Sequence, residues 1–170
     1  MTLSTREMHA LLIGYFAAEK QESLLFVAVG VAALVVSAFL LRGGGPYRGM
    51  VLPLAAVALI QLGVGGGVWL RTDRQVADLS ARLDREPAAY RVAETARMEK
   101  VMSGFRLYKA VEIALLAAGI GLALLFPSRD VLYSVGIGLV AQAALMLVLD
   151  LFAERRAREY LDALARLAGG

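Results

Sequence analysis

Four polar side chains stand inside long apolar stretches of the sequence, where a polar group needs either a partner or a function. They are Gln61, Gln142, Glu112 and Asp150. Amides donate and accept hydrogen bonds and carboxylates hold protons or cations, so these residue types suit the lining of a polar path. They also suit a structural role, in which amides hydrogen-bond between helices and carboxylates form ion pairs. The sequence leaves both interpretations open.

The depth of these residues predicts two polar layers. Gln61 and Gln142 each lie about ten to twelve residues from the first charged residue beyond their apolar run, which is roughly 15–18 Å along a helix. We therefore expect the two amides at one level, where they can bond to each other. Glu112 and Asp150 lie closer to the charged ends of their runs. They predict a shallower layer. It is either an ion-pair belt with the basic neighbours Arg71, Lys109, Arg106 and Arg155, or an acidic vestibule for a cation or proton.

The elements that must position these residues are four membrane spans. Of the 170 residues, 59% are hydrophobic, and a bilayer core about 30 Å thick is crossed by roughly 20 apolar helical residues. The apolar runs predict an all-α integral membrane protein, a four-transmembrane-helix bundle. Its spans are residues 23–41, 50–70, 107–126 and 131–151. The first run is followed by Arg42 and three glycines and is preceded by a mixed segment, so it is read as a retained span and not as a signal peptide.

The distribution of basic residues predicts the orientation. The two connections at one end, residues 42–49 and 127–130, together carry only Arg42, Arg48 and Arg129. The other 15 of the 18 Lys and Arg residues lie on the opposite side, so the positive-inside rule places both termini in the cytoplasm. This arrangement predicts a multi-pass protein of a bacterial inner (plasma) membrane. The outer connections are too short to form a receptor domain.

Polar sequence between and after the spans also has helical periodicity. Residues 71–106 predict a cytoplasmic helical hairpin with its turn at 84–88, because Pro87 breaks a helix and fits the first turn of the next. Residues 152–170 predict a C-terminal cytoplasmic helix, so spans two to four extend as helices into the cytoplasm. Residues 1–22 predict an amphipathic helix that lies flat at the membrane interface or packs on the hairpin. The apolar stripes of these helices fit the core of a cytoplasmic bundle or a docking surface for a partner.

Small residues at four-residue spacing occur in every span, and this spacing lets two helices approach closely. The pairs predicted to serve packing within the chain or between copies are Gly63 and Gly67, Ala117 and Gly121, and Ser134 and Gly138. The glycine run around Gly65 is not a phosphate loop, because no Lys-Ser/Thr pair follows it.

No catalytic constellation is present in the sequence, and no cofactor is expected. The chain has no cysteine and its only histidine is His9, so thiol chemistry and Glu-x-x-His metal pairs are excluded, although the carboxylates leave metal binding undecided. Charge is balanced beyond the spans, which argues against a nucleic-acid partner.

Three functions remain as expectations. The first is a scaffold or accessory subunit that is not an enzyme. It forms a homo-oligomer, contacts a membrane or cytoplasmic protein partner, and presents its cytoplasmic helices to it. The second is a subunit of an oligomeric ion channel or transporter, with a path through Gln61 and Gln142 and a vestibule at Glu112 and Asp150. The third is a lipid-active membrane enzyme.

Overall fold

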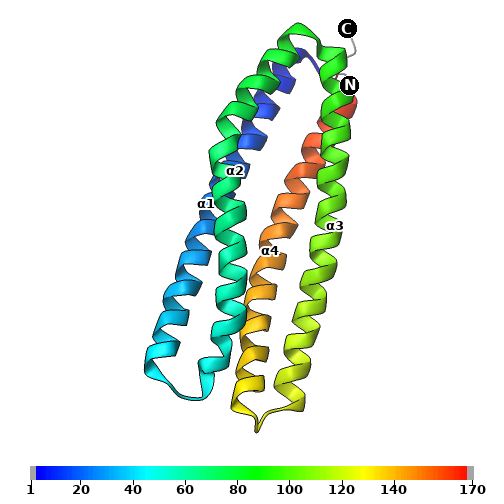
Figure 1. Ribbon diagram of the computed structural model, residues 1–170. Coiled ribbons are helices and arrows are strands. Elements are labelled where there is room, and N and C mark those ends of the chain that lie inside the picture. The colour runs from blue at the N-terminus through cyan, green and yellow to red at the C-terminus, as the bar shows by residue number, and fades with distance from the viewer. Residues whose placement is uncertain (1–2, 168–170) are drawn as a thin grey trace.

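The structure is a computed structural model, and it describes residues 3–167 as an all-helical bundle (Figure 1). Its elements in chain order are α1 (Thr5–Gly43), the short 3₁₀ helix η1 (Pro46–Met50), α2 (Val51–Arg85), α3 (Pro87–Leu125) and α4 (Asp130–Arg166). All four long helices are long and apolar enough to cross a membrane.

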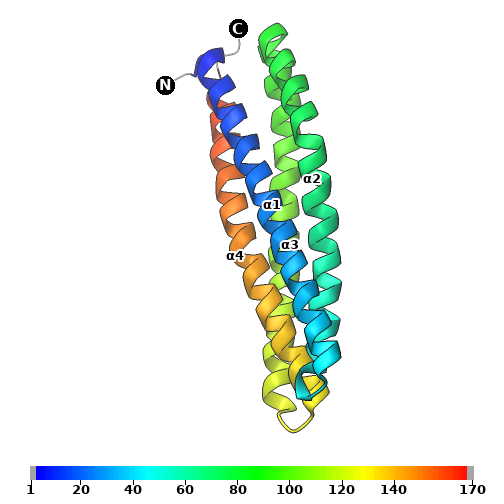
Figure 2. The same cartoon turned by 90° about the vertical axis from the view of Figure 1, so that its left-hand side faces the viewer.

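Two helical hairpins, α1–α2 and α3–α4, make up the bundle. Helices pack along their length within each hairpin, whereas α2 and α3 have few contacts with each other. The α1–α2 and α3–α4 connections lie at one end of the molecule, and the α2–α3 turn, the start of α1 and the end of α4 lie at the other (Figures 1 and 2). At the connection end, η1 packs against α4 and joins the two hairpins.

The helix boundaries follow from local sequence. Ser4 accepts a hydrogen bond from the Glu7 backbone N–H, and Glu7 accepts one from the Ser4 backbone, which completes a capping box before α1. Gly44 and Gly45 have φ values of 67° and 86°, which glycine adopts without strain, and they end α1. Pro87 occupies the first turn of α3, as its fixed φ and missing N–H favour.

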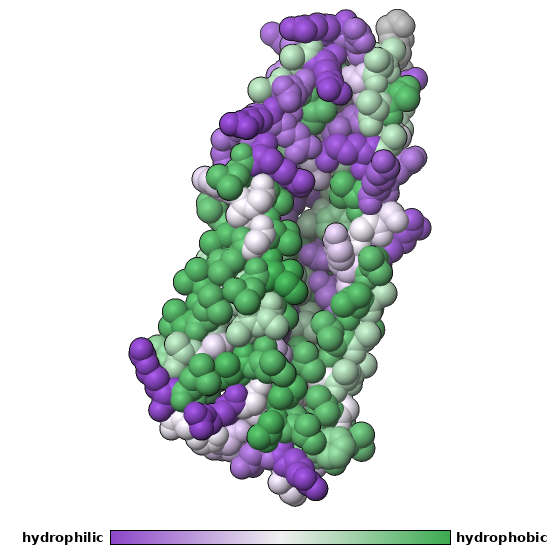
Figure 3. Space-filling view, in the orientation of Figure 1, coloured by the Kyte–Doolittle hydropathy of each residue, from purple (hydrophilic) through white to green (hydrophobic). Residues whose placement is uncertain are grey.

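The surface divides the bundle into two halves (Figure 3). In the apolar half, residues 23–70 and 107–151, many large hydrophobic side chains point outward. Among the most exposed are Phe39, Leu52, Leu124 and Leu125. In the polar half, residues 3–22, 71–106 and 152–167, charged side chains cover the outside (Figure 3). An outward apolar surface around a four-helix bundle is typical of proteins that have lipid as their solvent.

The main core of buried hydrophobic residues lies in the polar half. All four helices contribute to it, with Met8, Leu12, Tyr15, Phe16, Leu83, Tyr90, Met98, Ala157, Tyr160, Ala163, Leu164 and Leu167. The apolar stripes outside the predicted spans therefore pack against one another. Within the described chain most of them form a core, although Phe152 of α4 is 63% exposed. A docking surface for a partner stays a prediction.

Two expectations about the helix ends need correction. The segments predicted as residues 1–22 and 23–41 are not separate elements, because α1 runs without a break from Thr5 to Gly43. Consequently all four spans extend into the polar half, and not only spans two to four. Of the two alternatives for the first half of α1, packing on the hairpin is the one observed, because Leu12 and Phe16 are fully buried in a core that includes Leu83 of α2. Parts of the first and last predicted segments, residues 1–2 and 168–170, lie outside the described residues.

Small residues set the closest helix approaches. A Cβ added at Gly119 of α3 would lie 2.8 Å from the Gly136 carbonyl oxygen of α4, so the two backbones meet there. Within the first hairpin, a Cβ at Gly65 of α2 would lie 2.7 Å from the Ser23 carbonyl oxygen of α1.

The small residues predicted from sequence fall into two groups. Ser134 and Gly138 are buried, and a Cβ at Gly138 would lie 2.7 Å from the Pro53 ring. The other four, in contrast, pack no helix of their own chain at close range. Gly63, Gly67 and Gly121 have no atom within 4 Å of an added Cβ, and Ala117 is exposed. Packing within the chain is therefore the wrong interpretation for these four, and packing between copies stays a prediction for them.

Candidate functional site

The four predicted polar residues all point into the bundle. Gln61 of α2 is 0% exposed, Gln142 of α4 is 4% exposed, Glu112 of α3 is 6% exposed and Asp150 of α4 is 7% exposed. Three helices therefore bring these residues inside the apolar half.

The two amides do not bond to each other as expected. Gln61 Nε2 instead donates a hydrogen bond to the Sδ atom of Met146 at 3.1 Å. Met146 follows Gln142 by one helical turn, so the hairpins pack with Gln61 about one turn away from the expected partner. The Oε1 atoms of Gln61 and Gln142 are buried and have no hydrogen-bond partner within residues 3–167. Buried acceptors without a partner are unfavourable by about 1–3 kcal/mol each, so both oxygens are open to a hydrogen-bond donor.

The two carboxylates Glu112 and Asp150 face each other across the α3–α4 interface. The Oε2 atom of Glu112 is buried and has no hydrogen-bond partner. The predicted ion-pair belt does not include this pair, because the basic neighbours that were expected to reach it are engaged elsewhere or point outward. Lys109 binds Glu154, Arg71 approaches Glu19, Arg155 binds Glu159, and Arg106 is exposed.

An ion-pair belt does lie one turn further along α4. Glu154 accepts hydrogen bonds from Lys109 Nζ at 2.5 Å and from Arg158 at 2.9 Å. The hydrogen bond from Lys109 is the main reason that the pKa of Glu154 is lowered. Arg156 pairs with Glu22 through two hydrogen bonds, one of them 3.0 Å long. This second pair joins α4 to α1 and therefore links the two hairpins.

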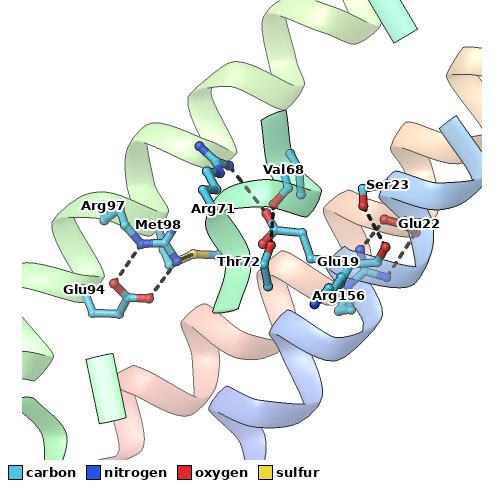
Figure 4. A network of polar contacts seen from close by, with 11 residues as sticks. Glu19, Glu22, Ser23, Val68, Arg71, Thr72, Glu94, Arg97, Met98 and Arg156 are labelled. Atoms are coloured by element: carbon cyan, nitrogen blue, oxygen red, sulfur yellow. Dashed lines mark hydrogen bonds and ion pairs between the residues drawn. The ribbon is translucent and has the colours of Figure 1, made fainter. Parts of the chain in front are cut away.

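Next to this belt, Glu19 of α1 lies among arginines in the polar half (Figure 4). Burial raises the pKa of Glu19 above its ordinary value, although nearby positive charges oppose the shift. These charges come from the other three helices, on Arg71, Arg97 and Arg156. Arg71 approaches the Glu19 carboxylate only to 3.9 Å, and the second carboxylate oxygen has no partner. Because no arginine pairs closely with Glu19, the effect of burial on its pKa is larger than the opposing effect of the arginines.

A buried hydrogen-bond chain in the polar half escaped the sequence analysis. Glu94 is fork-paired with Arg97 at 2.7 and 2.8 Å and accepts a hydrogen bond from the Tyr160 hydroxyl at 3.3 Å. The Tyr160 and Tyr90 hydroxyls are 2.6 Å apart. Burial raises the pKa of Tyr90 to about 12 and also raises that of Tyr160. The sequence feature that could have indicated this chain is Glu94, a glutamate within an apolar stripe, followed three residues later on the same helix by Arg97.

In residues 3–167, no three His, Asp or Glu side chains lie close enough together to hold a metal ion. The carboxylate pair and the open amide oxygens can accept protons or hydrogen-bond donors.

The fold and the site together show the class of protein: a helical bundle with four candidate membrane-spanning helices. No protein-family model matches the chain, and neither a curated protein nor a solved structure matches it.

Proposed function

We propose that the chain is a non-enzymatic membrane scaffold that self-associates in the bilayer and presents its polar half to a protein partner in the cytoplasm. The observation that carries the proposal is the division of the same four helices into an apolar-surfaced half and a separate, core-filled polar half. A solid core gives the polar half a fixed shape, as a docking platform requires.

The surface of the polar half supports a charged, and not an apolar, contact with the partner. Leu161 and Leu164 of α4 pack against or in the core, so they do not form an open apolar face. Large exposed hydrophobic residues are sparse in this half, and Leu11, Ile13 and Val92 are among them. Charged side chains cover most of the remainder, so electrostatic complementarity selects the partner.

The positive-inside rule supports the orientation, with the polar half in the cytoplasm. The chain has no cysteine, so single cysteines report sidedness cleanly. In intact bacterial cells, a membrane-impermeant maleimide should label a Ser128→Cys variant, whose cysteine stands in the α3–α4 connection. A Glu86→Cys variant, with its cysteine in the α2–α3 turn, should react only after the cells are permeabilised. The reverse labelling pattern would refute the proposed orientation.

Self-association is supported by the outer face of α2. Gly63 and Gly67 lie one turn apart on this face and are exposed, and a Cβ added at either would meet no other helix of residues 3–167 within 4 Å. Backbone exposed to lipid at this spacing fits a close helix–helix contact with a second copy.

Replacing both Gly63 and Gly67 by isoleucine should weaken self-association about tenfold or more, which corresponds to about 1.4 kcal/mol. The added side chains would hold two α2 helices apart, and they have open space within their own chain. Oligomer size in lipid nanodiscs measures the effect. Gly43→Ile is the matched control, because Gly43 of α1 also has open space around it. A monomeric wild-type protein, or an unchanged oligomer in the double variant, would contradict this interface.

A further inference from the structure

One buried carboxylate pair differs from the other strongly buried acidic residues of the described chain. Glu112 and Asp150 face each other, are 6% and 7% exposed, and neither forms an ion pair. In contrast, Glu94 is paired with Arg97, and Glu154 with Lys109 and Arg158.

The neighbouring charged groups do not neutralise the pair. Glu22 of α1 and Glu154 of α4 are the carboxylates that act on Asp150, and both add negative charge. Their own cations, Arg156 for Glu22 and Lys109 and Arg158 for Glu154, are held in ion pairs. No charged side chain of α2 acts on the pair within residues 3–167.

Two adjacent carboxylates in a water-poor interior cannot both be ionised, because each destabilises the charge of the other and burial destabilises both. A proton on one carboxyl group removes one charge and supplies a hydrogen-bond donor. It also provides an explanation for the buried Glu112 Oε2 atom, which has no partner among the protein atoms.

We propose that Glu112 and Asp150 share one proton at neutral pH and form a proton-binding site between α3 and α4. A calcium or magnesium ion fits the site less well, because these ions take six or more oxygen ligands and the described chain offers no third acidic or histidine ligand. The inference goes beyond the proposed scaffold role and does not depend on a partner or on self-association.

Infrared spectroscopy of the protein in lipid nanodiscs tests the proposal, because a protonated carboxyl group has a carbonyl band distinct from that of a carboxylate. The wild-type protein should show one protonated carboxyl per chain at neutral pH. Glu112→Gln and Asp150→Asn should each abolish this band, because the remaining carboxylate loses its acidic neighbour and ionises. Both replacements keep the size of the side chain, and circular dichroism verifies that the helices are retained.

Glu94→Gln is the control, because Glu94 is also buried and is paired with Arg97 but does not act on the pair, so its loss should leave the band unchanged. Absence of the band in the wild-type protein would overturn the proposal. A band that persists in either single variant would also overturn it, because burial alone would then retain the proton. Disappearance of the wild-type band on addition of sodium or potassium, with the pH held constant, would assign the site to a cation instead.

Discussion

Replacing Phe16 by alanine should destabilise the polar half of the bundle by about 3–5 kcal/mol, the usual cost of deleting a buried aromatic ring. Phe16 is fully buried, and its ring meets the Tyr15 ring edge-on at a centroid distance of 5.0 Å. The Arg97 guanidinium lies 5.4 Å from the centre of the Phe16 ring, so the substitution also removes a cation–π contact. Denaturant unfolding in detergent, followed by amide hydrogen exchange in the polar half, measures the loss.

The matched control for Phe16 is Val92→Ala in the same half. Val92 is 69% exposed, so its truncation should change stability by no more than about 0.5 kcal/mol. Equal effects of the two substitutions would show that the core described around Phe16 does not hold the polar half together. Loss of protection confined to the polar half would in addition show that the apolar half folds without it.

Replacing Gly119 by valine should separate α3 from α4 in the apolar half. Even the first carbon of a side chain at Gly119 would lie 2.8 Å from the Gly136 carbonyl oxygen, which is a backbone atom that cannot rotate away. Overpacking of a close contact costs about 1–3 kcal/mol when neighbours adjust, and we expect a value at or above the upper end. Thermal unfolding in detergent measures the destabilisation.

Gly121→Val gives the control for Gly119, because Gly121 lies on the same helix and has no atom within 4 Å of an added Cβ. It should leave the stability of the isolated chain nearly unchanged. Gly136→Val should reproduce the effect of Gly119→Val, since an added Cβ there would lie 2.6 Å from the Gly119 carbonyl oxygen. A tolerated valine at both positions would contradict the close approach of the two helices.

The sequence predicted the four long apolar helices, because a run of about 20 apolar residues has few alternatives to a membrane helix. It also placed the α2–α3 break at Pro87, where the ring prevents continuation of a helix. It did not predict that α1 continues past residue 22. The polar and apolar parts of α1 have no breaking residue between them, and the change in composition was mistaken for a boundary.

Contacts between helices were harder to predict than the helices themselves. The spacing of Gly63 and Gly67 is the same as that of a packed pair, yet both face outward, while the buried contact uses Gly119 and Gly136. Small-residue spacing does not distinguish the inside of a bundle from its surface. Similarly, equal depth suggested a bond from Gln61 to Gln142, but a difference of one turn in the packing placed Met146 opposite Gln61. The position of one helix along another depends on tertiary packing, and the periodicity of a single helix does not predict it.

The unbroken course of the helices from one half to the other has a mechanical consequence. α1 and α3 each have 39 residues, roughly 58 Å at 1.5 Å per residue, with no kink-forming proline between the two halves. A rod without a hinge cannot absorb a tilt locally. In the proposed membrane oligomer, a change in bilayer thickness or in the angle between neighbouring copies therefore reaches the far tip of the polar half as a displacement, because the helices transmit it without bending.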